Sequence, residues 1–365
     1  MKKIGIDARL YYQTGVGVYL KNLLYYLNKI NPKNLKFVVY VLKKDYQKIR
    51  KEYKNIAFKG VNAKWHTFSE QILFLIDILK DNLDLMHFTY FSYPVFYPKK
   101  YISTIHDTTL LNYKTGKAST KSTFVYNFKH SIFKHMFYKQ VSKSLIIITP
   151  TESVKKQIVK LVKDVDPKKI QPIYEGVTRE YLINSRNANK SASKINYFLY
   201  VGTFYPHKNV DNLIKAYSKI KTDIKLYLVG PDDFFSKRIE NLISNLNLQN
   251  KIKIFKKVSQ YDLPEFYKNA TALIHPSLSE GFGLPIIEAV YFNLPIIASK
   301  IDVFQEILEE NYLGFDPNNI NDIREKIEFF IRERREFDYK NLLKKYSFEK
   351  MTKKTLELYK EACAS

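Results

Sequence analysis

The chain has 365 residues, 45% of them apolar, which is enough for two domains that each bury a core. Its single cysteine, Cys363, excludes a disulfide within the chain and a cysteine-based metal site, and it fits a reducing cytosol. The net charge of +24 resides mostly in residues 1–180, and this favours an anionic membrane, lipid diphosphate or nucleic acid as partner, unless it reflects biased base composition.

The first half alternates short apolar runs with helical patterns. Lys3–Asp7 is a strand pattern with no signal-peptide character, and Tyr19–Ile30 and Leu35–Val41 continue as helix and strand. This rhythm predicts a parallel sheet covered by helices. The apolar run Ile72–Leu79 is too short to cross a bilayer. Further strands are predicted at Leu85–Phe88, Tyr101–Ile105 and Leu145–Thr149.

Residues 117–143 mix Lys and His with aromatic and aliphatic side chains and contain no acidic residue. As a helix this segment would be basic and amphipathic, a pattern typical of peripheral contact with an anionic membrane. An ordinary packed helix with solvated lysines is the alternative. A signature for nucleic-acid binding is missing, so that class of function is not expected.

The polar segment 184–196 predicts a domain boundary, and the strand and helix rhythm restarts after it. The expected fold is two doubly wound, Rossmann-like α/β domains with a ligand cleft between them. The predicted parts are a first domain at 1–180, a linker at 181–196, a second domain at 197–346 and a helix at 347–365 that packs back on the first domain. Strands of the second domain are predicted at Tyr197–Val201, Lys225–Val229, Lys251–Phe255, Thr271–His275 and Pro295–Ser299.

Two carboxylates flank a glycine loop that joins a strand to a helix. Glu280 lies in the loop and Glu288 about one turn into the helix. Gly281 and Gly283 allow close approach of the backbone, and the amides of a helix N-terminus suit a diphosphate. Each carboxylate can accept two hydrogen bonds from a sugar diol. The alternative is that Glu280 is a helix-entry charge and Glu288 a solvated face residue.

This stretch resembles the E-x7-E signature of the retaining glycosyltransferases of family 4, which have the GT-B fold. The resemblance extends over nearly the full chain. Its other carriers are IDAR at 6–9, TGVG at 14–17, TIHD at 104–107, YVGTFYPHKN at 200–209 and VGPDD at 229–233.

The resemblance implies that the first domain is the acceptor side and that the second is the nucleotide-sugar domain, which carries the donor site. Glu288 would bind the ribose, and Glu280 would hold the donor sugar and diphosphate with the backbone of residues 281–284. Lys208 would neutralise the leaving diphosphate. The implied donor-binding residues of this domain are Thr203, Lys208, Val258, Tyr261, Glu280, Gly281, Phe282, Gly283, Leu284 and Glu288, of which Val258 and Tyr261 would contact the base. Lys208 could instead be one of many solvated lysines.

In the first domain the resemblance implies that Gly15 and Gly17 bring backbone amides to the diphosphate. His106 would contact the donor sugar near the reaction centre, and the implied catalytic group is His106, Lys208 and Glu280. The alternatives are a tight turn at the glycines and a strand-end histidine with ordinary partners.

The chain departs from the family pattern in three places. Thr203 and His207 stand where many members carry Arg, so a second cation at the phosphates is in doubt. If His207 contributes, activity should fall as pH rises through its titration. Asn293 replaces a common Gly after the helix, and Asn also tolerates the left-handed conformation.

The resemblance implies a retaining, metal-independent hexosyltransferase that needs no cofactor beyond its nucleotide-sugar co-substrate. The opening IDAR and TGVG segments look most like mannosyltransferases of surface polysaccharide synthesis, which implies GDP-mannose and a glycan or lipid-linked acceptor. A UDP-sugar donor and a non-catalytic nucleotide-sugar binder are the alternatives. The expected location is the cytoplasm, including the inner face of its membrane, and the oligomeric state is open.

Overall fold

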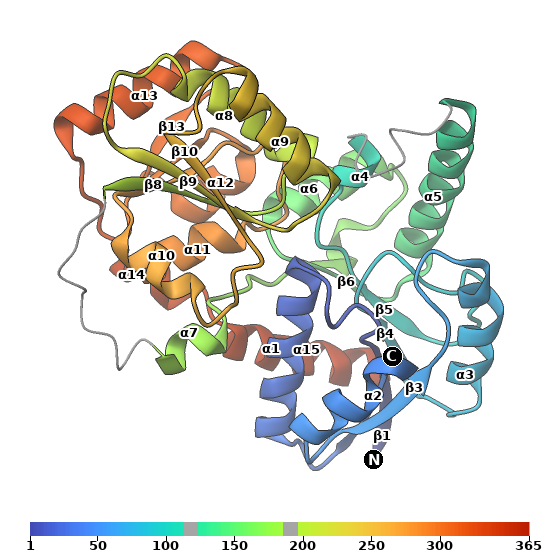
Figure 1. The fold of residues 1–365 in the computed structure, drawn as a ribbon. Coiled ribbons are helices and arrows are strands. Elements are labelled where there is room, and N and C mark those ends of the chain that lie inside the picture. The colour runs from blue at the N-terminus through green and yellow to red at the C-terminus, as the bar shows by residue number, and fades with distance from the viewer. Residues whose placement is uncertain (113–122, 185–195, 365) are drawn as a thin grey trace. The chain divides into compact units, whose positions relative to one another are not determined.

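The computed structural model describes residues 1–112, 123–184 and 196–364. These residues form two compact units (Figure 1). The first comprises Met1–Leu111, Thr123–Gly176 and Ser347–Ser365. The second comprises Val177–Tyr346 together with a short stretch before Thr123. Most of the predicted linker, residues 185–195, lies outside the described part of the chain.

The first unit contains a parallel sheet of seven described strands in the order β3-β2-β1-β4-β5-β6-β7. Strand β1 lies in the interior of the sheet, where Ile4 is paired with both Phe37 and Leu85. Its strands are β1 Lys2–Asp7, β2 Leu35–Leu42, β3 Ala57–Val61, β4 Leu85–Phe88, β5 Tyr101–Thr104, β6 Ile147–Thr149 and β7 Ile170–Pro172.

Apolar faces of the helices complete the core of the first unit. Leu20, Leu24 and Leu27 of α1 are buried at helical spacing, and α1 ends at Asn31, which adopts the left-handed conformation. The described helices of this unit are α1 Gly15–Ile30, α2 Lys43–Ile49, α3 Leu75–Leu79, α4 Thr109–Asn112, α5 Thr123–Lys143, α6 Glu152–Leu161 and α15 Phe348–Ala364, with short helices η1 Arg50–Glu52, η2 Glu70–Phe74 and η4 Pro167–Lys169.

The C-terminal helix α15 packs against α1 and β4 of the first unit. Its Tyr359 is fully buried, and the Tyr359 hydroxyl lies 2.7 Å from Nδ1 of His87 on β4. The chain therefore returns from the second unit to the first for its last helix.

The second unit contains a parallel sheet of six described strands in the order β10-β9-β8-β11-β12-β13. Its central strand β8 is completely buried, as expected for a parallel strand covered on both faces. The strands are β8 Tyr197–Val201, β9 Lys225–Gly230, β10 Ile252–Lys256, β11 Ala272–His275, β12 Ile296–Ser299 and β13 Leu313–Phe315.

Helices cover both faces of this second sheet (Figure 1). Side chains of α8, α9 and α13 form one core with the strands. The described helices of the unit are α7 Arg179–Asn184, α8 Val210–Tyr217, α9 Phe234–Asn245, α10 Leu263–Asn269, α11 Leu284–Tyr291, α12 Asp302–Leu308, α13 Ile320–Glu333 and α14 Lys340–Lys345, with the short helix η6 Pro206–Lys208.

The second unit begins at Val177, a few residues before the predicted end of the first domain at 180. The reason is aromatic packing by α7. The ring of Tyr181 lies 5.7 Å from that of Phe292 and 6.5 Å from that of Tyr267, both in the second unit. This packing draws the chain into the second unit before the polar segment starts.

Candidate donor site

Two loops of the second unit are fastened together by hydrogen bonds. A backbone hydrogen bond joins the loop after β8 to the loop after β11, because the amide of Leu278 donates to the carbonyl of His207 at 2.8 Å. The buried side chain of Asn209 donates to the carbonyls of Pro276 at 3.1 Å and Pro317 at 2.7 Å. Both loops follow strand C-termini, the edge where parallel α/β sheets bind ligands. The predicted site residues Lys208 and Glu280 are thereby brought together.

Glu280 receives three hydrogen bonds on one oxygen. Its Oε1 lies 2.6 Å from Nζ of Lys208, 2.7 Å from Oγ of Ser277 and 3.0 Å from Nε2 of His275. None of these three bonds uses the other oxygen, Oε2. Neither His275 nor Ser277 was singled out from the sequence, although both lie in the segment that carries the signature.

The charge of Glu280 is maintained by its neighbours. Burial alone would raise the pKa of this carboxyl, but the charge of Lys208 and the hydrogen bonds from His275 and Lys208 hold it well below its usual range. Burial and the charge of Lys208 lower the pKa of His275, so the imidazole is neutral and donates through Nε2. Glu280 and Lys208 thus form a buried ion pair with a neutral histidine behind it.

Helix α11 begins at the second glycine of the loop. Gly283 has φ of 84°, and a Cβ added there would lie 2.8 Å from the ring of Phe304, so only glycine fits without strain. Pro285 occupies the first turn, where its missing N–H costs nothing. The first amides of a helix have no carbonyl partner four residues earlier. Within this turn Pro285 offers no N–H, and the amides of Ile286 and Ile287 donate to the carbonyl of Gly283 at 2.9 and 3.4 Å. What this end of α11 offers an anion is therefore chiefly the favourable dipole of the helix N-terminus.

Glu288 lies one turn into α11, as predicted, but in a different environment from Glu280. It is buried, and its Oε2 accepts a 2.6 Å hydrogen bond from the hydroxyl of Tyr267 on α10. Burial raises the pKa of Glu288 to about 7, and the Tyr267 bond offsets only part of that effect. The ring of Tyr267 stacks on Phe292, with centroids 5.5 Å apart. The partner Tyr267 was not predicted.

The remaining predicted donor residues of this unit differ in exposure. Val258 is half-buried, whereas Tyr261 is 72% exposed, two residues before the helix that carries Tyr267. Thr203 is half-buried, and its carbonyl accepts a hydrogen bond from Tyr200. Phe282 is buried against Tyr346, with ring centroids 5.8 Å apart.

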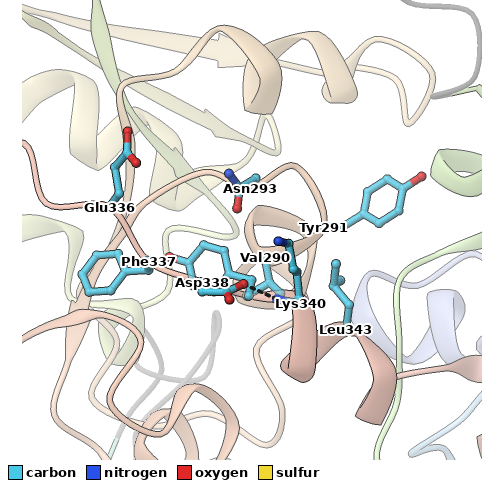
Figure 2. Close-up of a pocket in the computed structure, with 9 residues that line it drawn as sticks. Val290, Tyr291, Asn293, Glu336, Phe337, Asp338, Lys340 and Leu343 are labelled. Carbon is cyan, nitrogen blue, oxygen red and sulfur yellow. Dashed lines mark hydrogen bonds between the residues drawn. The ribbon is translucent and has the colours of Figure 1, made fainter.

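The left-handed turn after α11 is confirmed, because Asn293 has φ of 52°. Asn293 also contributes to a surface pocket in Figure 2, which contains none of the predicted site residues. This pocket is lined by Val290, Tyr291, Asn293, Glu336, Phe337, Asp338, Tyr339, Lys340 and Leu343.

In the first unit, Gly15 and Gly17 at the start of α1 have different surroundings. A Cβ at Gly15 would meet nothing within 4 Å, so the backbone there is open to a ligand. A Cβ at Gly17 would lie 2.7 Å from the carbonyl oxygen of Tyr11. Close packing is therefore sufficient to explain the glycine at position 17. It does not explain the glycine at position 15.

His106 follows β5 and is held on both ring nitrogens. Its Nε2 lies 3.0 Å from the carbonyl oxygen of Thr89, to which it donates, and Nδ1 lies 3.3 Å from Oε1 of the buried Glu175. The ring also meets Tyr19 edge-on at 4.8 Å. These contacts fix the imidazole in one orientation. Glu175, 69 residues away in the chain, was not predicted.

The IDAR segment forms a buried ion cluster. Arg9 makes 2.6 Å contacts with both Asp7 and Glu70, and its guanidinium lies 3.8 Å from the centroid of the Phe74 ring. Serine 92 donates a further hydrogen bond to Glu70. This part of the resembling sequence therefore ties β1 to η2.

Within the described residues, no group of three or more His, Cys, Asp or Glu side chains could hold a metal ion. Asp232 pairs with Lys256 and Lys257, each at 3.2 Å, and Asp233 caps α9 by accepting from Phe235 and Ser236. None of the helices in the described ranges has the length and apolarity needed to span a membrane.

The two parallel-sheet units define the class of protein as the GT-B fold. The structure is similar to that of sucrose-phosphate synthase from Thermosynechococcus elongatus, with a TM-score of 0.77, 16% identity and full coverage of both chains. It is also similar to HepE from Anabaena, solved with UDP and glucose, with a TM-score of 0.74, 14% identity and coverage of 99% of this chain and 100% of that one.

Residues 183–350 match the family model described as glycosyl transferases group 1, so this segment is a group 1 glycosyltransferase domain. The chain is 32% identical to the O-antigen chain mannosyltransferase RfbU of Salmonella typhimurium, over 60% of this chain and 62% of the relative. It is 30% identical to O-antigen chain mannosyltransferase B of Escherichia coli, over 45% of each chain. The matches thus span less than two thirds of these relatives' lengths.

Proposed function

We propose that the protein is a retaining hexosyltransferase that moves mannose from GDP-mannose to a glycan or lipid-linked glycan. The observation that carries the proposal is the contact of Lys208 with Glu280 beside the N-terminus of α11, in a domain of the glycosyltransferase family. Mannose is proposed because the relatives RfbU and mannosyltransferase B are mannosyltransferases by name. A UDP-sugar is the second candidate donor, since HepE was solved with UDP and glucose.

Each half of the signature would have its own task. The backbone of residues 281–284 at the start of α11 and the charge of Lys208 would hold the diphosphate, and Oε2 of Glu280 would accept from the donor sugar. Both oxygens of an ionised Glu288 would be needed for a ribose diol, one of them shared with the Tyr267 hydroxyl. Val258 and Tyr261 would contact the base.

In the proposed reaction the bond between the anomeric carbon and the diphosphate oxygen breaks first, with an oxocarbenium-like ion pair as the high-energy species. The acceptor oxygen then attacks the same face, and the departing diphosphate takes the acceptor proton. Lys208 would stabilise the negative charge that grows on the diphosphate, which is the largest class of catalytic effect. No covalent enzyme intermediate is needed.

The first unit would serve the acceptor and complete donor binding. Gly15 would bring open backbone to the diphosphate, and the fixed imidazole of His106 would contact the donor sugar. A lipid-linked acceptor would be met at the inner face of the cytoplasmic membrane.

The direct test is a thermal-shift screen of the full chain against GDP-mannose, UDP-glucose, UDP-galactose and the free nucleotides. GDP-mannose should raise the melting temperature most, and release of mannose from it without acceptor should be measurable. A larger shift with a UDP-sugar would replace GDP-mannose as donor. Binding with no release of sugar at any protein concentration would favour a non-catalytic nucleotide-sugar binder.

Stereochemistry and metal dependence need separate measurements. The anomeric configuration of the product, determined by NMR spectroscopy, should match that of the donor, and inversion would contradict the proposed mechanism. Turnover should survive addition of a strong chelator. Loss of turnover that returns with a divalent cation would show that the enzyme depends on a metal.

A further inference from the structure

An apolar ridge crosses the surface of the first unit. Phe68, which is 80% exposed, precedes the short helix η2, and Ile72 and Leu73 lie on η2 with about half of their surfaces exposed. Ile76 continues the ridge on α3, and Phe96 is 75% exposed in the loop after β4. These five residues, called the ridge below, are large apolar side chains that the described part of the molecule leaves in solvent.

The ridge is a rigid consequence of the local fold. Residues 70–74 form a π-helical turn in which Glu70 and Phe74 both point inward to Arg9. Because these inward positions are fixed by a buried ion pair and a ring contact, Ile72 and Leu73 are held outward.

Hydrogen bonds join the two segments of the ridge. The side chain of Gln71 donates to the carbonyl of Tyr93 and accepts from the amide of Val95, both at 2.9 Å. This holds the loop that carries Phe96 beside η2.

Lysine side chains of α5 lie next to the ridge. Nζ of Lys139 on α5 lies 4.8 Å from the centroid of the Phe96 ring, and Lys134 on the same helix is exposed. The sequence of α5 contains no acidic residue. His66, two residues before Phe68 of the ridge, contacts the same helix, because its ring lies 6.1 Å from that of Phe133 on α5. The cations therefore border the apolar side chains.

Three of the four acidic residues of the surrounding segment form ion pairs away from the ridge. Between residues 64 and 100 they are Glu70, Asp77, Asp81 and Asp84. Glu70 is buried with Arg9, and Asp81 and Asp84 pair with lysines of the neighbouring strands. Asp77 directly follows Ile76 on α3. The two lysines of α5, Lys134 and Lys139, outnumber this carboxylate, so the net charge beside the ridge is positive.

From this combination we infer that the ridge docks the protein on the surface of an anionic lipid bilayer. Aromatic and aliphatic side chains enter the headgroup region, while lysines at their border meet lipid phosphates. The inference rests on the proposed function in one respect, because a lipid-linked acceptor would lie in the membrane that this unit contacts. It assigns the contact to residues 68–76 and 96 instead of the whole segment 117–143. In the described part of α5, Phe137 and Val141 are buried in the core.

Charge argues against a second copy of the chain as the occupant. A symmetric dimer through the ridge would bring Lys134 and Lys139 toward the same residues of the other copy, and α5 itself has no acidic residue to pair with them. Like charges brought together in this way oppose association. An anionic bilayer supplies the missing negative charge.

The inference is tested with the full chain and vesicles of phosphatidylglycerol and phosphatidylcholine in a flotation assay at low salt. Phe68→Ser, Ile72→Ser and Leu73→Ser combined should lower the partition coefficient about tenfold or more. The single variant Phe96→Ser tests the second segment of the ridge independently in the same assay. The matched control is Phe234→Ser with Leu246→Ser, two exposed apolar side chains of the second unit that should leave binding unchanged. Lys134→Gln and Lys139→Gln should each weaken binding about fivefold.

Vesicle binding by the triple variant and the Phe96→Ser variant equal to wild type would overturn the inference. So would binding to neutral vesicles as strong as to anionic ones. A change from dimer to monomer in light scattering, without any loss of vesicle binding, would identify a second copy as the occupant. Sugar release from the donor in solution separates the two proposals. If wild type binds vesicles through the ridge but releases no sugar, the proposed function fails while the membrane contact stands.

Discussion

The two glutamates of the donor signature have the same side chain and occupy opposite electrostatic environments. Glu280 is kept ionised by Lys208, whereas burial beside Tyr267 brings the pKa of Glu288 to about 7. The difference arises from their partners, since a cation compensates for desolvation and a neutral hydroxyl does so only in part. One carboxylate is therefore charged throughout the physiological range, and the other changes its charge within it.

The largest expected effect comes from removing the cation of the Glu280 pair. Lys208→Ala should lower kcat by about 10²–10³-fold, because the leaving diphosphate loses its compensating charge. It should also lower the free energy of unfolding at neutral pH by about 3 kcal/mol, because Glu280 is left buried without its cation. Steady-state kinetics and urea denaturation measure the two effects.

The pH dependence distinguishes this explanation from general damage. A carboxyl with a depressed pKa stabilises the fold above its ordinary range, and this contribution is lost as pH falls through that range and below it. The stability gap between wild type and Lys208→Ala should hence narrow as the pH is lowered from about 6 toward about 3. Lys215→Ala, at an exposed lysine of α8, is the control and should change neither quantity. A gap that is independent of pH would contradict the assigned role of the ion pair.

Glu288→Gln should have opposite effects on stability and on donor binding. The folded state keeps a proton on Glu288 up to about pH 7, whereas the unfolded chain releases it near the ordinary value of 4.5, so stability falls as pH rises between these values. The amide removes this cost, which corresponds to at most about 3 kcal/mol. The variant should thus melt at a higher temperature than wild type at pH 8. Differential scanning calorimetry at pH 5 and pH 8 measures the effect.

Donor binding by the same variant should become weaker by about tenfold or more, because an amide cannot accept a ribose diol on both of its polar atoms. Titration calorimetry with the donor nucleotide measures this at pH 8. Glu325→Gln on α13 is the control and should behave like wild type. If Glu288→Gln is less stable at pH 8 and binds the nucleotide normally, Glu288 is an ordinary structural residue.

The sequence predicted the central strands of both sheets and missed three of the four edge strands that the structure describes. Ten of the predicted strands coincide with observed strands to within one or two residues. The strands β3, β7 and β13 were not predicted, and each lies at the edge of its sheet. β7 and β13 have only three residues each, and β3 is largely exposed, so none has the continuous apolar run of a buried central strand.

The same limit applies to the site. Lys208, Glu280 and Glu288 were accessible because they belong to short local patterns. Their partners were not all accessible, because the contact of Tyr267 with Glu288 depends on how α10 packs on α11. Glu175 meets His106, and Glu70 meets Arg9, across separations of 69 and 61 residues that no local pattern encodes. Sequence thus located these functional groups but not the distant side chains that contact them.

The smallest expected effect concerns the hydroxyl that holds Glu288. Tyr267→Phe keeps the ring that stacks on Phe292 and removes the hydrogen bond that favours the ionised carboxylate. The pKa of Glu288 should therefore rise above about 7, and the pH at which donor binding becomes strong should rise with it. A hydrogen bond worth about 1 kcal/mol predicts a shift of somewhat less than one pH unit.

The KM for the donor, measured from about pH 6 to about pH 9, should rise severalfold near pH 7 and approach the wild-type value at the alkaline end. Tyr197→Phe removes a hydroxyl that donates to the backbone of Phe266 and should leave this profile unchanged. An unaltered profile in Tyr267→Phe would mean that burial alone sets the charge of Glu288, and the contrast with Glu280 would then rest on Lys208.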